Sequence, residues 1–247
     1  MNHNIPKPSH PEHLAPLFAS TPARLGVWRA GARPLTVSWL KFRQDHALAR
    51  DAVHSELSCN FLDGLVKRRG LPVIQSLAQD RRDFVLNPPR GKRADAEVVA
   101  RLKEQCGCGR DVQIVISDGL SAKAVELNIP DLLPMLEHGL ELERISCGTP
   151  VVVRFGRVAI ADQIGNALGA RLAINLIGER PGLSPALGLS AYLTYNPGPH
   201  TISSDRTVVS NIHPQGTPAA EAGAYIVQLA KRILAAQVSG VRLQQMA

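Results

Sequence analysis

In the stretch from residue 110 to residue 247, short runs of β-branched and other apolar residues alternate with segments of helical periodicity. The runs are bounded by glycine, proline or polar turn residues, as strands usually are. They predict strands at residues 112–116, 151–155, 172–177 and, more weakly, 189–195. Because parallel strands need crossover connections, this alternation predicts an α/β fold with a mainly parallel sheet covered on both faces.

The predicted helices follow from apolar residues that recur every three or four positions. Residues 37–65 form one or two helices, and residues 95–105, 162–168 and 218–237 one each. A further helix opens after Gly119, with Ser121 as its N-cap, and Gly169 closes the helix over 162–168. The last helix is expected to bury five residues, Ala222, Ile226, Leu229, Ile233 and Leu234.

Proline and polar segments divide the chain into three predicted parts. Residues 1–20 contain Pro6, Pro8 and Pro11 without apolar periodicity, which is typical of a flexible arm. Residues 21–93 are expected to be a mainly helical N-terminal region. It ends in the polar segment 80–93, where Pro88 and Pro89 prevent a helix from continuing. Residues 94–247 form the sheet domain.

The charge of the chain leaves two classes of partner open. A net charge of +7 and a pI near 9.6 would suit a nucleic-acid binder, because basic groups displace counterions from phosphates. The chain has no long basic run, however, and its five Phe, three Tyr and two Trp offer few platforms for stacked bases. A basic surface that meets an acidic partner subunit fits equally well.

The cysteines, the apolar segments and the absence of known motifs exclude several kinds of site and location. Four cysteines are too few for a disulfide scaffold and are expected as thiols, and Cys106 and Cys108 lack the further ligands of a zinc site. No apolar window has the length of a membrane span, and residues 1–6 lack the basic and apolar regions of a secretory signal, so a cytoplasmic location is expected. Dinucleotide, phosphate-loop and nucleophile-elbow motifs are absent. The chain is therefore expected to bind something rather than to be a self-sufficient catalyst.

Polar residues at strand ends are the candidate binding residues, because ligands of parallel sheets collect at the carboxyl ends of strands. Asp118 is either a turn residue or a ligand contact. Glu179 is suited to an amide or hydroxyl ligand, or else pairs with Arg180 or another arginine. Residues 204–213 are expected to be a second loop, dense in donors and acceptors, or only a turn. His213 could be a general base or a metal ligand, but no partner for either role is evident nearby.

Seven further segments carry a family signature: residues 29–34, 112–121, 156–158, 162–165, 178–182 (Gly-Glu-Arg-Pro-Gly), 205–207 and 210–213. Together they resemble the small subunits of ethanolamine ammonia-lyases, which are adenosylcobalamin-dependent radical enzymes. The resemblance runs from about Thr21 to the C-terminus. The resemblance implies a Rossmann-like domain preceded by a small helical region.

The same resemblance implies a hetero-oligomer in which a large subunit, a (β/α)₈ barrel, binds ethanolamine. The small subunit closes over the other side of the corrin ring. An adenosyl radical then abstracts hydrogen from ethanolamine, and migration and elimination give acetaldehyde and ammonia. Catalytic side chains are expected in the large subunit, and no metal ligand, nucleic acid or membrane partner is expected for this chain.

The family's cobalamin contacts correspond to Val158, Glu179 and Val208, with Arg206 added because it is adjacent in sequence. A relative can have cysteine where this chain has Val208, which matters little if that contact is made by the backbone. The resemblance also offers a bacterial microcompartment as an alternative location, although the leading arm is shorter than the extension that packages some family members. The competing hypothesis is a stand-alone basic α/β module that binds RNA or a nucleotide.

Overall fold

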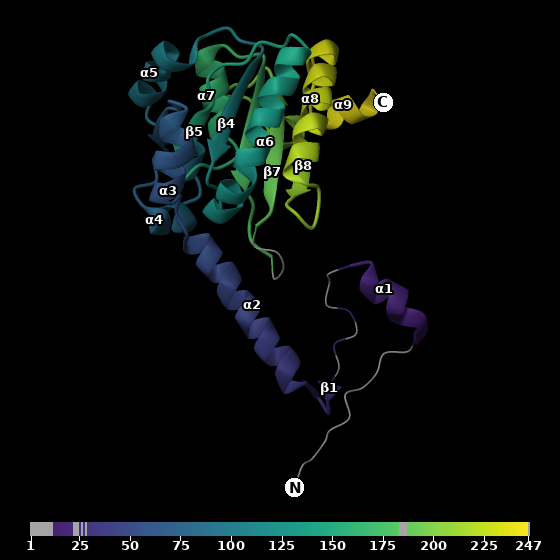
Figure 1. Ribbon diagram of the computed structural model, residues 1–247. Coiled ribbons are helices and arrows are strands. Elements are labelled where there is room, and N and C mark those ends of the chain that lie inside the picture. Colours follow the sequence, from purple (N-terminus) through teal and green to yellow (C-terminus); the bar gives the residue numbers. More distant parts are fainter. Residues whose placement is uncertain (1–11, 22–24, 26, 28, 183–186, 247) are drawn as a thin grey trace.

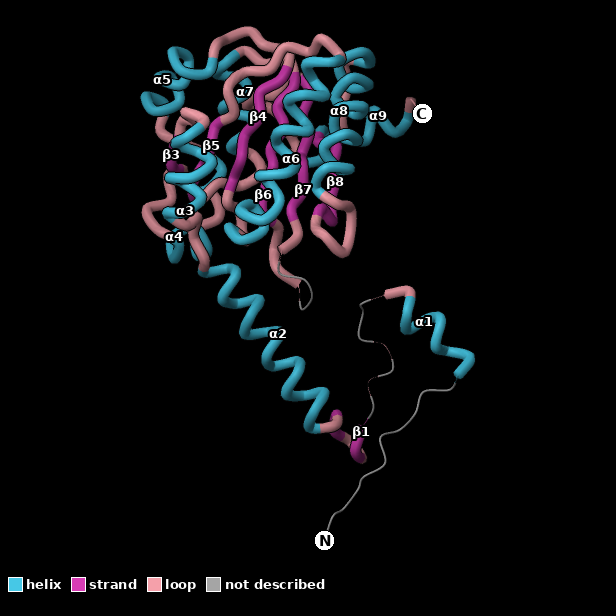
Figure 2. The backbone as a smooth tube through the Cα atoms, viewed as in Figure 1, coloured by secondary structure: helices cyan, strands magenta, loops and turns pink. Residues whose placement is uncertain are grey.

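The computed structural model describes residues 12–246 apart from 22–24, 26, 28 and 183–186. Its centre is a six-stranded sheet in the order β3-β5-β4-β6-β7-β8 (Figures 1 and 2). The strands are β3 (Val73–Gln75), β4 (Val112–Ser117), β5 (Val151–Arg154), β6 (Leu172–Gly178), β7 (Leu189–Tyr195) and β8 (Arg206–Ile212). Strands β3, β5, β4 and β6 are parallel, whereas β7 runs antiparallel to both β6 and β8. The predicted α/β class with a mostly parallel sheet is confirmed.

Helices pack on both faces of this sheet. The helices of the sheet domain are α5 (Ala96–Cys106), α6 (Ala122–Leu142), α7 (Ile160–Leu168), α8 (Ala219–Ala236) and α9 (Val241–Gln245). Helices α6 and α8 lie side by side over one face and enclose the larger apolar cluster (Figure 1). Helices α5 and α7 enclose a smaller cluster on the opposite face, over β4, β5 and β6. The five residues that the sequence predicts to be buried in the last helix are all buried, as expected.

The prediction of a loop at residues 204–213 was wrong, because most of this segment is strand β8. Only Ser203–Asp205 form a 3₁₀ turn, and Arg206–Ile212 form the edge strand of the sheet. The strand buries Val209 and Ile212 against the larger cluster but leaves polar neighbours exposed on its other side. A strand with one exposed face is rich in donors and acceptors, and this composition led to its interpretation as a loop.

The polar segment 80–93 contains a helix that the sequence did not predict. Helix α4 (Arg81–Leu86) begins where the Asp80 side chain accepts a hydrogen bond from the N–H of Asp83, and it ends at Asn87, before the prolines. Strand β3 lies N-terminal to the expected domain boundary near residue 93 and pairs with β5. The sheet therefore takes one edge strand from the region expected to be helical, while the boundary itself stays a prediction.

The N-terminal part extends away from the sheet. Residues 1–11 of the expected flexible arm lie outside the described residues, and the rest of it holds a 3₁₀ turn (Glu12–Leu14) and the helix α1 (Ala15–Ala19). After the short strands β1 (Arg29–Ala30) and β2 (Arg33–Pro34), helix α2 (Thr36–His54) projects from the body (Figure 1). Helix α3 (Cys59–Phe61) and a π-helical turn (Leu62–Val66) return the chain to the core. Across the described residues, no helix combines the length and the hydropathy of a membrane span.

Candidate functional site

Asp118 follows β4 at the carboxyl ends of the parallel strands, and its contacts show which of its two predicted roles it has. Its side chain is only 1% exposed, and one carboxylate oxygen accepts a hydrogen bond of 3.0 Å from the N–H of Gly156. The other oxygen lies 3.6 Å from the guanidinium of Arg81. Burial raises the pKa of Asp118 to about 6, although these donors favour its charged form. Asp118 is thus occupied in holding the loops together, which supports the turn role rather than a ligand contact.

Asn175 attaches the loop after β5 to the middle of the sheet. Its side-chain amide donates to the carbonyl oxygen of Val158 at 3.1 Å, and its own oxygen accepts from the Ser117 hydroxyl at 2.9 Å. The N–H of Val158 has no acceptor within hydrogen-bond distance among the described residues. The loop is therefore positioned by its carbonyl group, while its backbone donor is left for a ligand or for water.

Glu179 follows β6 and is held by a tyrosine rather than by an arginine. The hydroxyl of Tyr192, on β7, donates to one carboxylate oxygen of Glu179 at 2.8 Å. Burial and then the Glu179 carboxylate raise the pKa of Tyr192 to about 12, so the hydroxyl stays protonated as a donor. No ion pair to Glu179 occurs within the described part of the chain. The second carboxylate oxygen is free to accept a hydrogen bond from an amide.

Val208 lies on the same face of the sheet as Asn175 and Tyr192, in register with both. Val208 pairs with Tyr192, which in turn pairs with Asn175, so the three side chains form a row across the sheet. The α5–α7 cluster on this face contains no residue of β7 or β8. Val208 is accordingly 47% exposed. The described structure therefore exposes this face at Val208 on the edge strand, with Glu179 and Val158 partly exposed nearby, whereas Ser190 and Thr194 on β7 are buried.

Arg206 differs from the other three predicted residues because its guanidinium is already engaged. It lies two residues before Val208 on the same face, and it forms a largely buried ion pair with Asp162 at the start of α7. Burial raises the pKa of Asp162, and the Arg206 guanidinium opposes that shift. The pair joins β8 to α7, so Arg206 fixes α7 against this part of the sheet.

The sequence analysis did not single out two further polar residues of this face. Tyr192 and Ser190 alternate with apolar residues along β7, and Ser190 is fully buried with a hydroxyl that has no hydrogen-bond partner in the described structure. Period-two alternation is the signal that could have found them, because it places polar side chains together on one face. The fourth strand was predicted, but the polar positions within it were not used.

His213 is a structural residue. Its ring Nε2 lies 2.7 Å from the side-chain oxygen of Asn211, and its Nδ1 accepts from the N–H of Gln215 at 3.2 Å. Both nitrogens hold the turn after β8, and the residue is 5% exposed. Among the described residues, no three His, Cys, Asp or Glu side chains gather as a metal site would require.

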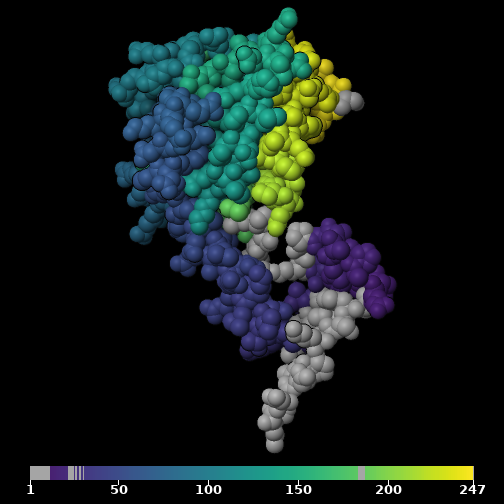
Figure 3. Space-filling model, in the orientation of Figure 1, coloured from purple at the N-terminus to yellow at the C-terminus, as the bar shows by residue number. Residues whose placement is uncertain are grey.

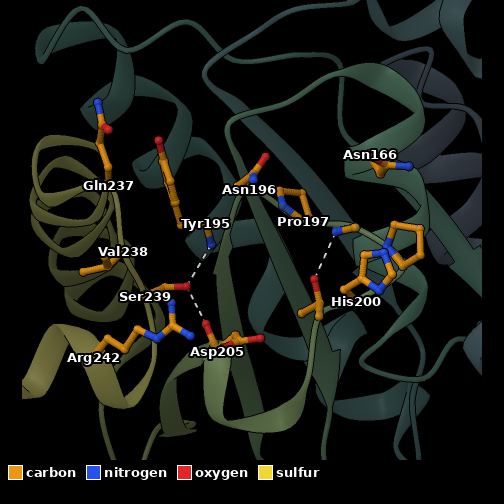
Figure 4. A pocket seen from close by; sticks show the side chains of 13 residues that line it. Asn166, Tyr195, Asn196, Pro197, His200, Asp205, Gln237, Val238, Ser239 and Arg242 are labelled. Carbon is orange, nitrogen blue, oxygen red and sulfur yellow. Dashed lines mark hydrogen bonds between the residues drawn. The ribbon is translucent and has the colours of Figure 1, made fainter.

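A separate cavity lies where β7 ends and β8 begins, at the other end of these strands from Glu179. It has a volume of about 470 Å³ and is lined in part by Tyr195, His200, Asp205 and Arg242 (Figure 4). The Ser239 hydroxyl accepts from the N–H of Tyr195 at 2.9 Å and donates to the carbonyl of Asp205, as Figure 4 shows. None of the four predicted cobalamin-binding residues lines this cavity.

The chain matches known proteins over nearly its whole length. A family model described as "Ethanolamine ammonia-lyase light chain (EutC)" matches residues 11–244. A protein of Fusobacterium nucleatum named "Ethanolamine ammonia-lyase small subunit" is 46% identical over 224 residues, which cover 91% of this chain and 75% of the relative. The chain therefore belongs to the family of ethanolamine ammonia-lyase light chains.

Proposed function

We propose that this chain covers one side of adenosylcobalamin in an ethanolamine ammonia-lyase, whose large subunit covers the other side and binds ethanolamine. Family membership assigns the chain to this carbon–nitrogen lyase. The observation that carries the cofactor proposal is that Val158, Glu179 and Val208, from three different parts of the sheet, are each at least partly exposed on one side of it. Val158 keeps a free backbone donor and Glu179 a free carboxylate oxygen there.

The groups on this face suit the periphery of a corrin ring, which bears many amide side chains. The free N–H of Val158 can donate to an amide oxygen, and the free oxygen of Glu179 can accept from an amide nitrogen. Val208 offers apolar contact and its backbone. When bound, adenosylcobalamin supplies the radical chemistry, while the protein supplies position and shielding.

The division of labour follows from what this chain lacks. Asp118 and His213 are occupied in structural hydrogen bonds, and Arg206 is paired with Asp162. The remaining groups are suited to hydrogen bonds with the cofactor, and we place the substrate site in the large subunit. We also propose that the complex is cytoplasmic.

Co-expression with a candidate large subunit tests the proposal. The complex is purified and assayed for ammonia release from ethanolamine with and without adenosylcobalamin. We expect activity only when both subunits and the cofactor are present. RNA binding by the isolated chain that weakens steeply with salt, without cobalamin uptake by the mixture, would instead support the stand-alone RNA-binding module.

A further inference from the structure

The loop that carries Val158 begins with a strained residue. Phe155, directly after β5, has φ of +56°, a backbone conformation that is unfavourable for a bulky side chain. Such conformations cost free energy and persist only where the surrounding structure holds them. The next residue, Gly156, has no room for a side chain, because a Cβ there would lie 2.7 Å from the hydroxyl oxygen of Ser117. The path of the loop is therefore imposed by its packing.

A small apolar cluster holds Phe155 in this conformation. Ala78, Phe84 and Phe155 form the cluster, and the centroids of the two rings lie 6.3 Å apart. Phe84 lies on α4 and is fully buried. In the space-filling view, the part of the chain that includes α4 is packed against the body, whereas α2 stands clear of it (Figure 3). Helix α4 therefore supports the loop after β5.

Arg157, the residue before Val158, ties the loop to α4. Its guanidinium lies 4.2 Å from the centroid of the Phe84 ring and donates to the carbonyl oxygen of Phe84 at 3.0 Å. Its backbone N–H donates to the carbonyl oxygen of Gly91 at 2.7 Å. A Cβ at Gly91 would lie only 2.7 Å from Cγ of Arg157, so this contact is closely packed. Arg157 thus joins the loop to two separate points of the segment after β3.

The carboxylate of Asp118 balances the positive charge in this cluster. Arg81 lies over the same Phe84 ring at 4.9 Å and is 3.6 Å from Asp118. Burial lowers the pKa of Arg157, and the Asp118 carboxylate opposes that shift. Asp118 also accepts the hydrogen bond from the N–H of Gly156, next to Arg157. The charges therefore fix the same loop that the rings support.

We propose that Arg157 is a positioning residue for the cofactor, which holds the free N–H of Val158 where it can donate to an amide oxygen of adenosylcobalamin. This inference rests on the proposed function, because Val158 is one of the three proposed cofactor contacts. Asn175 fixes the carbonyl group of Val158 from the sheet, and Arg157 fixes the preceding residue from α4. Arg157 acts through the loop and does not itself touch the cofactor.

The test is Arg157→Ala in the small subunit, purified as the complex with the large subunit. We expect the dissociation constant for adenosylcobalamin, from spectroscopic titration, to rise about tenfold, as for the loss of one hydrogen bond. The KM for ethanolamine at saturating cofactor should stay at the wild-type value, because the substrate site is placed in the large subunit. Arg232→Ala is the control, since Arg232, on α8, also donates to a backbone carbonyl, that of Leu243 at 3.4 Å.

Hydrogen exchange gives a readout that does not depend on activity. In the complex without cofactor, amide exchange over residues 155–160 should be faster in Arg157→Ala than in the wild type, and unchanged in Arg232→Ala. If Arg157→Ala does not fold, Arg157→Lys replaces it. Lysine keeps the charge over the Phe84 ring but not the planar donor geometry of the guanidinium, so a smaller change in the same direction is expected.

Phe84→Leu tests whether Arg157 acts through α4. This variant removes the ring beside the guanidinium but keeps an apolar side chain. We expect it to raise the dissociation constant for adenosylcobalamin as well. The double variant should bind no more weakly than the weaker of the two single variants, because both substitutions break the same contact.

Three results would overturn the inference while leaving the proposed function intact. One is wild-type cobalamin affinity in Arg157→Ala. Another is weakened binding in Arg157→Ala together with wild-type affinity in Phe84→Leu, which would mean that the guanidinium contacts the cofactor directly. The third is loss of the large subunit from the Arg157 variant, which would make the residue necessary for assembly. A wild-type complex that binds no cobalamin would end both proposals, so the failures are distinguishable.

Discussion

Glu179 shows how a single strand-end residue acquires a binding role. Its position after a buried strand could be predicted from the sequence, but its partner could not. Arg180 is its neighbour in the chain, whereas the structure supplies the hydroxyl of Tyr192, 13 residues away on the antiparallel strand. The antiparallel direction of β7 was not predicted, so the proximity of Tyr192 to Glu179 could not be inferred.

We predict that Glu179→Ala weakens cobalamin retention by the assembled complex. One charge-assisted hydrogen bond is lost, which corresponds to about 10- to 100-fold in the dissociation constant. Spectroscopic titration of the complex with cobalamin measures the change. Glu104→Ala, at an exposed position of α5, is the control. Unchanged affinity and turnover in the Glu179 variant would contradict the assignment.

Asp118 predicts a pH dependence of stability. Because its pKa is raised to about 6 in the folded state, the folded chain holds this proton more tightly than the unfolded chain, whose carboxyl has the ordinary value near 3.8. The contribution is therefore favourable at low pH and is lost as pH rises from about 4 through 6. Relative to Asp118→Asn, the wild type should lose about 1 kcal/mol of unfolding free energy between pH 5 and pH 7.

Urea denaturation of both proteins at the two pH values measures this difference. The comparison removes the contributions of other carboxyl groups, because those are shared by the two proteins. If the difference in unfolding free energy between the two proteins stays constant with pH, or grows in favour of the wild type, the pKa of Asp118 is not raised in the folded state.

At the scale of elements, the loops after β4 and β6 depend on two glycines that touch. Gly119 has φ of +57°, and a Cβ there would overlap the carbonyl oxygen of Gly178. Leu120 donates to that same carbonyl oxygen at 2.9 Å. The close approach keeps Glu179 next to the end of β4, and a turn could be predicted there because a glycine follows a buried strand.

We predict that Gly119→Ala lowers the unfolding free energy by about 3 kcal/mol or more, because the side chain meets both backbone strain and a carbonyl oxygen that cannot move freely. Gly188→Ala is the control, since a Cβ at Gly188 meets nothing within 4 Å. Chemical denaturation of the two variants measures the effect. Equal stabilities would mean that the two loops do not touch in solution.

The elements also show what the sequence could and could not reveal. Strands β4, β5, β6 and β7 were predicted within two residues of their ends, because buried strands are apolar runs between turns. Strand β8 was missed because its outer face is polar, and α4 was missed because its six residues lie beside two prolines. The residues of the candidate site came from the family resemblance, while their arrangement on one side of the sheet required the sheet order.

At the scale of the whole molecule, the exposed β8 edge at Val208 is the surface that we propose faces the cofactor. We predict that Val208→Glu weakens cobalamin retention by the complex at least tenfold, because a carboxylate would be buried against the macrocycle. The melting temperature of the isolated chain should not change, since Val208 is half exposed. Val241→Glu is the control, and spectroscopic titration gives the affinities. Equal retention in the two variants would remove Val208 from the site.

The central claim is tested most directly by the structure of the assembled complex with cobalamin bound, determined by crystallography or electron cryo-microscopy. We predict corrin density against the sheet face, with Val158, Glu179 and Val208 at its periphery and the large subunit on the other side of the ring. Density that lies away from this face, with β7 and β8 covered only by protein, would contradict the account.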